Sequence, residues 1–424
     1  MIVPSIDLRN GHAVQLVGGK EMAIDAGDPR PVAERFRLAG EIAVIDLDAA
    51  LGAGDNAVVV RDLLALADCR VGGGVRSVEA ARAWLDAGAA KVILGTAARP
   101  EILRQLPKER LIAALDAEHD VVVVEGWRTK TGQRIVDRMA ELKEYVGGFL
   151  VTFVEREGRM GGFDLDRVKA LVEAAAPARL TYAGGVTTAE DVAALDRIGA
   201  DAQVGMALYS GRLSLGNAVA APLVSDRPDG LFPTVVADER GVTLGLVYSS
   251  FASLAAAIEK RRGVYHSRRR GLWVKGETSG DLQELLRVDL DCDRDALRFT
   301  VRQSGAGFCH TGTRSCFGED GGLGRLARRL AERLQNAPAG SYTRRLLDDP
   351  ELLRAKLIEE AGELAEATTR EAAVWETADL FYFALVALAR RGGSLADVER
   401  ALDRRERKLT RRPGDAKPDK GGGA

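Results

Sequence analysis

The chain of 424 residues contains only four cysteines, and aromatic side chains make up only 5% of it. Four cysteines in a chain of this length are too few for the disulfide scaffold of a small secreted protein. The sequence has no apolar run that approaches the roughly 20 residues needed to span a bilayer. The N-terminal residues show no basic flank followed by an apolar core, so we expect no signal peptide. We therefore expect a cytoplasmic protein without a membrane partner.

Charge of one sign is also lacking. The 60 basic and 62 acidic residues are interspersed and give a net charge of -2. We therefore expect no nucleic-acid partner, because such a partner requires a basic surface. The apolar share of 46% is ordinary for a globular protein, and the length exceeds that of one core. The composition thus predicts an enzyme-sized chain with two or three domains.

Short apolar strands alternate with alanine-rich amphipathic helices through residues 1–222. Eight such strands, from IVPSID to DAQVGMA, indicate a parallel (β/α)8 barrel. The run GGGVRSVEAARAWLDAGAAKVILGTA from Gly72 matches AGGVTTAEDVAALDRIGADAQVGMAL from Ala183, about 111 residues later. This internal repeat predicts two half-barrels of four units each.

The repeat places Asp7 and Asp116 at equivalent strand ends on opposite sides of the barrel mouth. Two such carboxyls are candidates for a general base and a general acid. Glycine-rich loops related by the same repeat can cradle two phosphates with backbone N–H groups. Alternatively, the aspartates only cap helices and the glycines only form turns. The phosphate-binding glycines that we expect are Gly73, Gly74, Gly95, Gly184, Gly185 and Gly205.

The polar run SDRPDG marks the end of the barrel pattern. Residues 226–318 read as short alternating strands with one helix, which predicts a small, mostly β domain. Residues 324–411 have apolar residues at helical spacing, which predicts an all-α domain. Residues 412–424 are rich in glycine, proline and lysine, and we expect them to form a disordered tail.

The run DLDCDRDALRFTVRQSGAGFCHTGTRSCF combines three thiols with three alternating carboxylates. Three thiolates suit Zn²⁺ with a fourth position left for water, and we assign Cys292, Cys309 and Cys316 to this role. Alternating carboxylates project from one face of a strand and fit Mg²⁺; they are Asp291, Asp293 and Asp295. The alternative is three unrelated buried cysteines and a solvated acidic turn.

Basic residues precede this run in YHSRRRGLWVKGETSG. Taken alone, a basic run is usually a solvated face. Beside a predicted zinc site, Arg268, Arg270 and Lys275 are candidates for binding a phosphate.

A second set of carboxylates lies on two predicted helices. In AKLIEEAGELAEA the glutamates are three and four residues apart and share one helical stripe, and in the next helix ExxD repeats the spacing. Crowded carboxylates are stable where Mg²⁺ bridges them and binds phosphates. The alternative is an exposed charged helix face. The candidate ligands are Glu359, Glu360, Glu363, Glu376 and Asp379.

Beyond these patterns, residues 226–317 resemble phosphoribosyl-AMP cyclohydrolase through DRPDG, LWVKGETSG, DCDRD and FCHTGTRSCF. The resemblance implies the same Zn²⁺ and Mg²⁺ ligands and hydrolytic opening of the adenine ring. It also implies a homodimer in which the first cysteine of each zinc site comes from the partner subunit.

The helical segment resembles phosphoribosyl-ATP pyrophosphohydrolase through EExxE, ExxD and SYTRRLLDD. This resemblance implies Mg²⁺-dependent cleavage between the α and β phosphates with release of pyrophosphate. Residues 225–417 together resemble the fungal multifunctional histidine protein.

The barrel resembles the ProFAR isomerase family through PSIDLRNGHAVQLVGG, VGGGVRS, ILGTAA and ALYSG. The resemblance implies an Amadori rearrangement with Asp7 as base, Asp116 as acid and Thr152 assisting. The chain departs from the family pattern at four positions. Gln15 and Met206 stand where the family usually has arginine. Glu157 replaces an aspartate, and Ala183 replaces a serine.

Three functions follow from these patterns. The first is a trifunctional enzyme of histidine biosynthesis acting on phosphoribosyl nucleotides. The second is a bifunctional cyclohydrolase and pyrophosphohydrolase with a catalytically silent barrel. The third is a zinc-dependent regulator that binds a nucleotide without consuming it.

Overall fold

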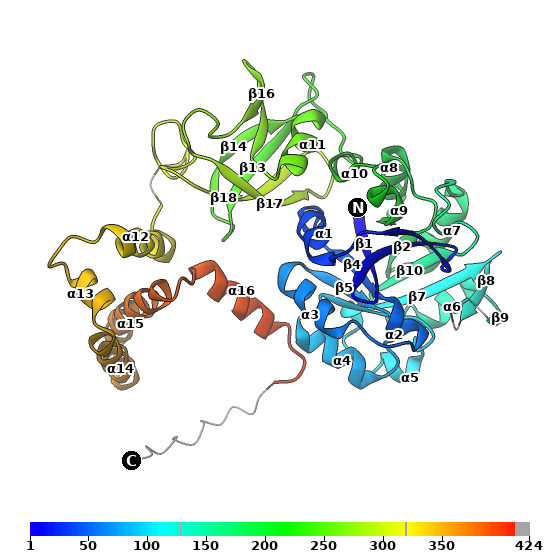
Figure 1. The fold of residues 1–424 in the computed structure, drawn as a ribbon, viewed down its shortest axis with the longest axis horizontal. Helices are drawn as coiled ribbons and strands as arrows, with labels where there is room; N and C mark the ends of the chain where they lie inside the picture. Colours follow the sequence, from blue (N-terminus) through cyan, green and yellow to red (C-terminus); the bar gives the residue numbers. More distant parts are fainter. Residues whose placement is uncertain (125, 128, 319, 412–424) are drawn as a thin grey trace, which may run out of the picture. The chain divides into compact units, whose positions relative to one another are not determined.

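A computed structural model describes residues 1–124, 126–127, 129–318 and 320–411 (Figure 1). The chain forms two compact units. The first contains Met1–Ala237, Leu246–Gly305 and residues 407–411, and the second contains Asp238–Gly245 and Ala306–Glu406. The three-domain division at residues 1–222, 226–318 and 324–411 stays a prediction. The tail predicted at residues 412–424 lies outside the described residues.

Eight parallel strands close into the predicted barrel, because β10 pairs with both β7 and β11 and β12 pairs with β1. Each of the eight predicted apolar segments contains one strand. In chain order they are β1 (Ile2–Arg9), β4 (Ile42–Asp46), β5 (Cys69–Gly72), β6 (Lys91–Leu94), β7 (Leu111–Glu118), β10 (Gly148–Phe153), β11 (Arg179–Ala183) and β12 (Asp201–Val204).

Helices surround these strands on the outside of the barrel (Figure 1). Their N-termini follow local rules: Ser77 caps α4, and Thr188 forms a capping box with Asp191 on α8. The helices are α1 (Pro29–Phe36), α2 (Leu47–Leu51), α3 (Ala57–Leu66), α4 (Val78–Ala87), α5 (Pro100–Leu103), α6 (Ile135–Leu142), α7 (Leu165–Ala175), α8 (Ala189–Arg197), α9 (Met206–Tyr209) and α10 (Leu215–Ala220), with two short 3₁₀ turns, η1 (Arg37–Ala39) and η2 (Lys108–Arg110).

The strands contribute a buried layer inside the barrel, formed by Ile93, Ile112, Leu150 and Ala183. Such layers fill the interior of (β/α)8 barrels and leave the strand ends to build the site.

Two hairpins extend the barrel sheet at symmetric positions. β2 (His12–Val17) and β3 (Glu21–Asp25) follow β1, while β8 (Val121–Val124) and β9 (Thr129–Arg134) follow β7. All four strands are antiparallel to their neighbours. Since β1 and β7 carry Asp7 and Asp116, each predicted catalytic strand has its own hairpin. The sequence patterns did not predict these hairpins.

A second sheet has the order β14-β13-β18-β17. Its strands are β13 (Phe232–Asp238), β14 (Thr243–Ser249), β17 (Gln283–Leu290) and β18 (Leu297–Gln303). Helix α11 (Phe251–Lys260) and a hairpin of β15 (Val264–Ser267) and β16 (Gly271–Val274) accompany it. Tyr265 and Phe299 are fully buried with ring centroids 5.5 Å apart.

The described residues after 320 form α12 (Gly322–Asn336), α13 (Tyr342–Asp348), α14 (Pro350–Glu366), α15 (Arg370–Arg390) and α16 (Leu395–Glu406). Leu330, Leu346, Leu353, Phe383 and Val386 form their shared core.

Among the described helices, α15 is long and apolar enough to cross a membrane by length and composition alone. From the sequence we expect no such segment. Phe383 and Val386 of α15 pack into the core formed with α12, α13 and α14, whereas Val374, Trp375 and Phe381 of the same helix are exposed.

Candidate active sites

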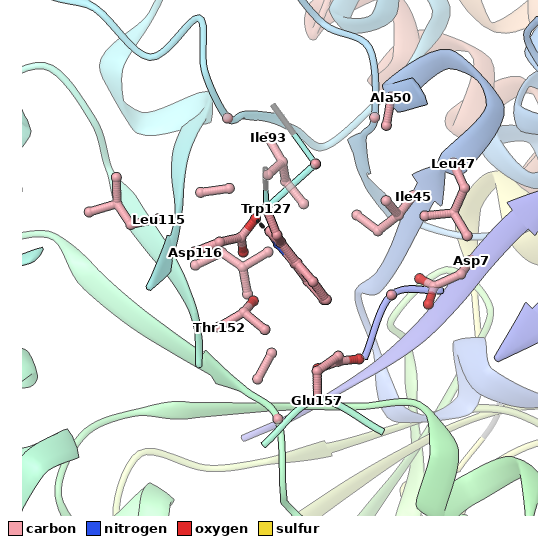
Figure 2. Close-up of a pocket in the computed structure, with 18 of the residues that line it drawn as sticks. Asp7, Ile45, Leu47, Ala50, Ile93, Leu115, Asp116, Trp127, Thr152 and Glu157 are labelled. Atoms are coloured by element: carbon pink, nitrogen blue, oxygen red, sulfur yellow. Dashed lines mark hydrogen bonds between the residues drawn. The ribbon is translucent and has the colours of Figure 1, made fainter. Parts of the chain in front are cut away.

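The carboxyl ends of the barrel strands surround a cavity of about 900 Å³. Its lining includes every barrel residue that the sequence singled out for chemistry. The catalytic candidates are Asp7, Asp116 and Thr152, and the phosphate candidates are Gly73, Gly74, Gly95, Gly184, Gly185 and Gly205. The two strand-end aspartates face the cavity from opposite sides, as the repeat predicts (Figure 2).

Asp7 sits on β1 with its carboxyl at the cavity wall. Burial raises its pKa to about 6, although a hydrogen bond from Ser5 Oγ to Asp7 Oδ1, 3.0 Å long, lowers it. Desolvation disfavours the charged form of a carboxyl, and it therefore brings the pKa of Asp7 close to neutral pH. A base with such a pKa can both accept and return a proton.

Asp116 lies beside Thr152 in the barrel sheet, where the two residues are register partners on β7 and β10. Burial raises the pKa of Asp116, and hydrogen bonds from Trp127 and Thr152 act in the opposite direction. Trp127 Nε1 donates to Asp116 Oδ2 over 2.8 Å. Its indole lies between Asp116 and Asp7 in the cavity (Figure 2). Asp116 is therefore held by two hydrogen-bond donors.

A third carboxyl, Glu157, also lines the cavity, and in the sequence it stands out only as a departure from the family pattern. Burial raises its pKa to about 8, and the charges of Asp7 and Asp116 add to this effect. Glu157 is therefore neutral at pH 7. Its place in the loop that follows β10 was visible in the sequence, but its proximity to both aspartates was not.

The glycine loops have the backbone that phosphate cradles need. Gly73 and Gly185 have φ values of +90° and +80°. A Cβ on Gly73 would lie 2.1 Å from the carbonyl oxygen of Asp46, and one on Gly185 would lie 2.3 Å from that of Gly162. No other residue fits at these two positions, because the side chain would clash with rigid backbone.

Several cations line the cavity and were not predicted as site residues: Lys20, Arg76, Arg99 and Arg138. By contrast, Gln15 is buried where the family has arginine, and its Nε2 donates to the carbonyl of Val14 at 2.9 Å. A Cβ on Gly205 would lie 2.4 Å from Gln15 Oε1, so this amide packs directly against the glycine.

The predicted magnesium ligands of the second sheet lie together in the connection between β17 and β18. Carboxylate oxygens of Asp291, Asp293 and Asp295 all lie within 4.8 Å of one another. A hydrogen bond with Asp291 and the nearby charges of Asp293 and Asp291 raise the pKa of Asp295. Carboxylates held this close repel one another, and a hard divalent cation relieves the repulsion.

None of the three predicted zinc ligands forms a disulfide. Cys292 belongs to the first compact unit, and Cys309 and Cys316 belong to the second. The hydroxyl of Thr311 donates to Cys309 Sγ over 3.1 Å, and this contact lowers the thiol pKa to about 6. A thiol that ionises this readily suits a metal ligand. The fourth cysteine, Cys69, is buried in β5, as expected of a core residue.

The predicted phosphate-binding basic residues lie near aromatic rings of the second sheet and its hairpin. The Arg268 guanidinium is 5.1 Å from the ring of Tyr248, and that of Arg270 is 5.1 Å from Trp273. Lys275, in contrast, is buried at 6% exposure. Their role in phosphate binding stays a prediction.

The helical segment gathers three of its five predicted carboxylates. Oxygens of Glu360 and Glu363 on α14 and of Glu376 on α15 lie within 4.8 Å of one another. Burial raises the pKa of Glu376, and the charges of Glu363, Glu360 and Asp379 raise it further. Glu359 is outside the cluster of three, and Lys356 Nζ lies 2.9 Å from it and 2.8 Å from Glu360.

Comparison with known proteins confirms the three resemblances in the predicted order. The family profile described as histidine biosynthesis protein matches residues 1–214, half of the chain. The chain belongs to this family. Profiles for phosphoribosyl-AMP cyclohydrolase and phosphoribosyl-ATP pyrophosphohydrolase match residues 245–318 and 323–406.

Similar proteins come from fungi and archaea. A histidine biosynthesis bifunctional protein of Schizosaccharomyces pombe is 52% identical over 218 residues, covering 50% of this chain and 52% of the relative. The histidine biosynthesis trifunctional protein of Saccharomyces cerevisiae is 56% identical over 196 residues, 46% of this chain and 24% of the relative.

The 1-(5-phosphoribosyl)-5-((5-phosphoribosylamino)methylideneamino) imidazole-4-carboxamide isomerase of Methanocorpusculum labreanum is 38% identical over 233 residues. This match covers 52% of the chain and 98% of the relative. The fungal relatives, in contrast, are matched over about half of their length or less.

Proposed function

We infer that the chain catalyses three consecutive steps of histidine biosynthesis. The helical segment hydrolyses phosphoribosyl-ATP to phosphoribosyl-AMP and pyrophosphate. The cyclohydrolase segment opens the adenine ring of phosphoribosyl-AMP, and the barrel isomerises the resulting ProFAR. The observation that carries the barrel step is the opposed pair Asp7 and Asp116 in one cavity lined by two glycine loops and several cations.

In the barrel, the proposed roles follow the two carboxyl environments. Asp116, held by Trp127 and Thr152, donates a proton to the ribose ring oxygen of ProFAR, and the sugar ring opens. Asp7, with a pKa of about 6, removes the proton from C2 of the opened sugar, the carbon next to the nitrogen-bearing C1. The enaminol so formed gains a proton at C1 and loses the proton of its C2 hydroxyl group, which gives the ketone of the product. Glu157 stays protonated at neutral pH and adds no negative charge to that of Asp7.

The residues present fit the proposed metals. The thiols of Cys292, Cys309 and Cys316 suit Zn²⁺, which lowers the pKa of a bound water and so supplies hydroxide for ring opening. The carboxylates of the two clusters suit Mg²⁺, which neutralises substrate phosphates. Arg268, Arg270 and Lys275 are proposed to contact a substrate phosphate. Each zinc site is proposed to be completed by a partner subunit in a cytoplasmic homodimer.

The test is turnover of phosphoribosyl-ATP by the purified chain with Zn²⁺ and Mg²⁺, with products separated by chromatography. We expect pyrophosphate release, ring opening and accumulation of the isomerised ribulosyl product. Arrest at ProFAR would show that the barrel is catalytically silent. The uncharged Gln15 and Met206, which replace arginines of the family, would then account for the missing isomerase activity. Binding of phosphoribosyl-ATP without any turnover would overturn the proposal in favour of a regulator.

A further inference from the structure

The connection between β17 and β18, residues 291–296, is a tight turn that the side chain of Asp291 helps to form. Asp291 N donates to the carbonyl of Ala296 over 3.2 Å. Asp291 Oδ1 accepts hydrogen bonds from the backbone N–H groups of Asp295 and Ala296, both 3.1 Å long. One carboxylate oxygen of Asp291 is thus used in hydrogen bonds within the turn. The geometry of the turn therefore determines the positions of the three carboxylates.

Arg294 ties this turn to the barrel, within the same compact unit. Its Nε donates to Asp196 Oδ2 over 2.9 Å, and its Nη2 donates to Asp196 Oδ1 over 3.0 Å. Asp196 lies on α8 of the barrel, and the two side chains are only 19% and 9% exposed. A partly buried, bidentate arginine–carboxylate pair is both strong and geometrically restrictive.

The same arginine is fixed at two further points. Its Nη1 donates to the carbonyl of Asp291 over 2.5 Å, across the turn. Its own carbonyl accepts a hydrogen bond of 2.9 Å from the N–H of Val224, in the segment after the barrel. Arg294 also has a φ of +68°, a conformation that non-glycine residues seldom adopt. The backbone conformation of Arg294 is therefore determined by the surrounding contacts and not by the intrinsic preference of an arginine residue.

Three carboxylates within 4.8 Å repel one another, so an unanchored turn would separate them. A cation would then have to gather its ligands again on binding, which weakens its affinity. The Arg294–Asp196 pair opposes this relaxation from outside the ligand set. Asp196 also accepts a hydrogen bond of 2.7 Å from the amino group of Met1, but that contact does not involve the turn.

We propose that Arg294 is a positioning residue through which Asp196 of the barrel holds the turn in its metal-binding geometry. The barrel is then part of the support for the cyclohydrolase metal site and not only a neighbouring enzyme. The inference rests on the proposed function in one respect, the role of Asp291, Asp293 and Asp295 as ligands.

The experiment measures Mn²⁺ binding to the zinc-loaded full chain by electron paramagnetic resonance. A Glu360→Gln/Glu363→Gln background removes the other carboxylate cluster from the titration. Arg294→Lys and Asp196→Asn should each weaken Mn²⁺ binding about 10-fold, the lower range for partners of metal ligands. The double variant should bind no more weakly than either single variant, since both changes remove one interaction.

The matched control is Arg261→Lys. Arg261 forms a salt bridge of 2.8 Å with Glu34 of α1, so it too links the second sheet region to the barrel, but not through the turn. Mn²⁺ affinity should be unchanged in this variant. Circular dichroism and thermal unfolding of all variants report whether the chain is still folded.

Unchanged Mn²⁺ affinity in both Arg294→Lys and Asp196→Asn would overturn the proposal. Asp293→Asn separates this failure from failure of the proposed function. If Asp293→Asn weakens binding while the other two do not, only the positioning role is wrong. If Asp293→Asn has no effect either, the assignment of the metal ligands is wrong, and the positioning role falls with it.

Discussion

The barrel cavity and the two acidic clusters both bring three carboxyl groups together, but in different surroundings. In the cavity, burial is the main cause of the raised pKa of Asp7, Asp116 and Glu157. In the turn of residues 291–295, Asp293 is exposed and the carboxylates chiefly affect one another. Desolvation favours protons on a carboxyl, whereas crowded carboxylates that stay hydrated favour a cation. The comparison therefore separates the cavity, as a site for proton transfer, from the turn, as a site for metal binding. The helical cluster is intermediate, because Glu360 is buried and burial is the first cause of the raised pKa of Glu376.

The largest expected effect is on the barrel side of this comparison. Asp7→Asn removes the proposed base and keeps the shape of the side chain. We expect isomerase kcat to fall by about 10²–10⁴-fold, the usual contribution of a general base. Pyrophosphate release and ring opening should keep their rates. Steady-state assays on ProFAR and on phosphoribosyl-ATP measure the two sides separately.

Asp25→Asn is the matched control for Asp7→Asn. Asp25 is exposed, contacts His12 Nδ1 at 3.0 Å and does not line the cavity. An equal loss of isomerase activity in both variants would mean that Asp7 acts through stability and not as a base.

Removal of divalent cations should produce the converse pattern. After treatment with a chelator, we expect pyrophosphate release and ring opening to fall by at least about 10-fold, since the crowded carboxylates and thiols lose the cations that carry the chemistry. Isomerisation should continue, because the proton transfers proposed for Asp7 and Asp116 require no metal ion. Chromatography of products from phosphoribosyl-ATP and from ProFAR, supplied separately, measures this. Loss of isomerisation on chelation would break the comparison.

Two substitutions separate the two metal-dependent reactions from each other. Cys309→Ser should stop ring opening and leave pyrophosphate release, while Glu360→Gln should do the reverse. Simultaneous loss of both reactions in either folded variant would mean that the two sites are not independent.

Periodicity explains how much the sequence could predict. Strand alternation and the internal repeat identified the barrel and placed Asp7 and Asp116 across its mouth, and the DCDRD spacing gathered three aspartates. Helical spacing was ambiguous, because both Glu359 and Glu360 share a stripe with Glu363. The structure resolves this ambiguity, since Glu360 joins the cluster and Glu359 lies beside Lys356.

Long-range contacts had no signal in the sequence. Glu157 reaches the two aspartates from a loop whose path no local rule fixes. Arg294 meets Asp196 across 98 positions of the chain, and nothing in either segment marks the pair. The two hairpins after β1 and β7 were missed because β3 is only 5 residues long and β9 has no apolar side chain. Such features depend on tertiary packing, which a single sequence does not display.

Glu157 allows a smaller effect to be tested within the cavity. Because its pKa is about 8, it is neutral below this pH and ionises above it. The new negative charge would repel the substrate phosphates, so the isomerase KM should rise several-fold between about pH 8 and 9. Glu157→Gln stays neutral and should abolish this rise. Isomerase KM measured across this pH range checks the prediction.

Glu118→Gln provides the control for Glu157→Gln. Glu118, the last residue of β7, is another carboxylate of the barrel, but it pairs with Lys130 at 2.7 Å and does not line the cavity. The alkaline rise in KM should persist in this variant. A rise that also persists in Glu157→Gln would assign it to another group.

The smallest expected effect concerns the hydrogen bond from Ser5 to Asp7. This bond lowers the pKa of Asp7, so Ser5→Ala should raise the pKa above its value of about 6. A base works when deprotonated, and the acidic limb of isomerase kcat/KM should therefore move to higher pH. One such hydrogen bond contributes roughly 0.5–1.5 kcal/mol, which corresponds to a shift of at most about one pH unit.

The direction of this shift distinguishes the proposed base from the proposed acid. If Asp7 instead donated the proton, a raised pKa would move the alkaline limb and leave the acidic limb in place. Ser5→Thr keeps the hydroxyl and should retain the wild-type profile, provided that the added methyl group is tolerated at this buried position. An acidic limb that stays fixed in Ser5→Ala while Asp7→Asn loses activity would mean that this limb reports the ionisation of another group.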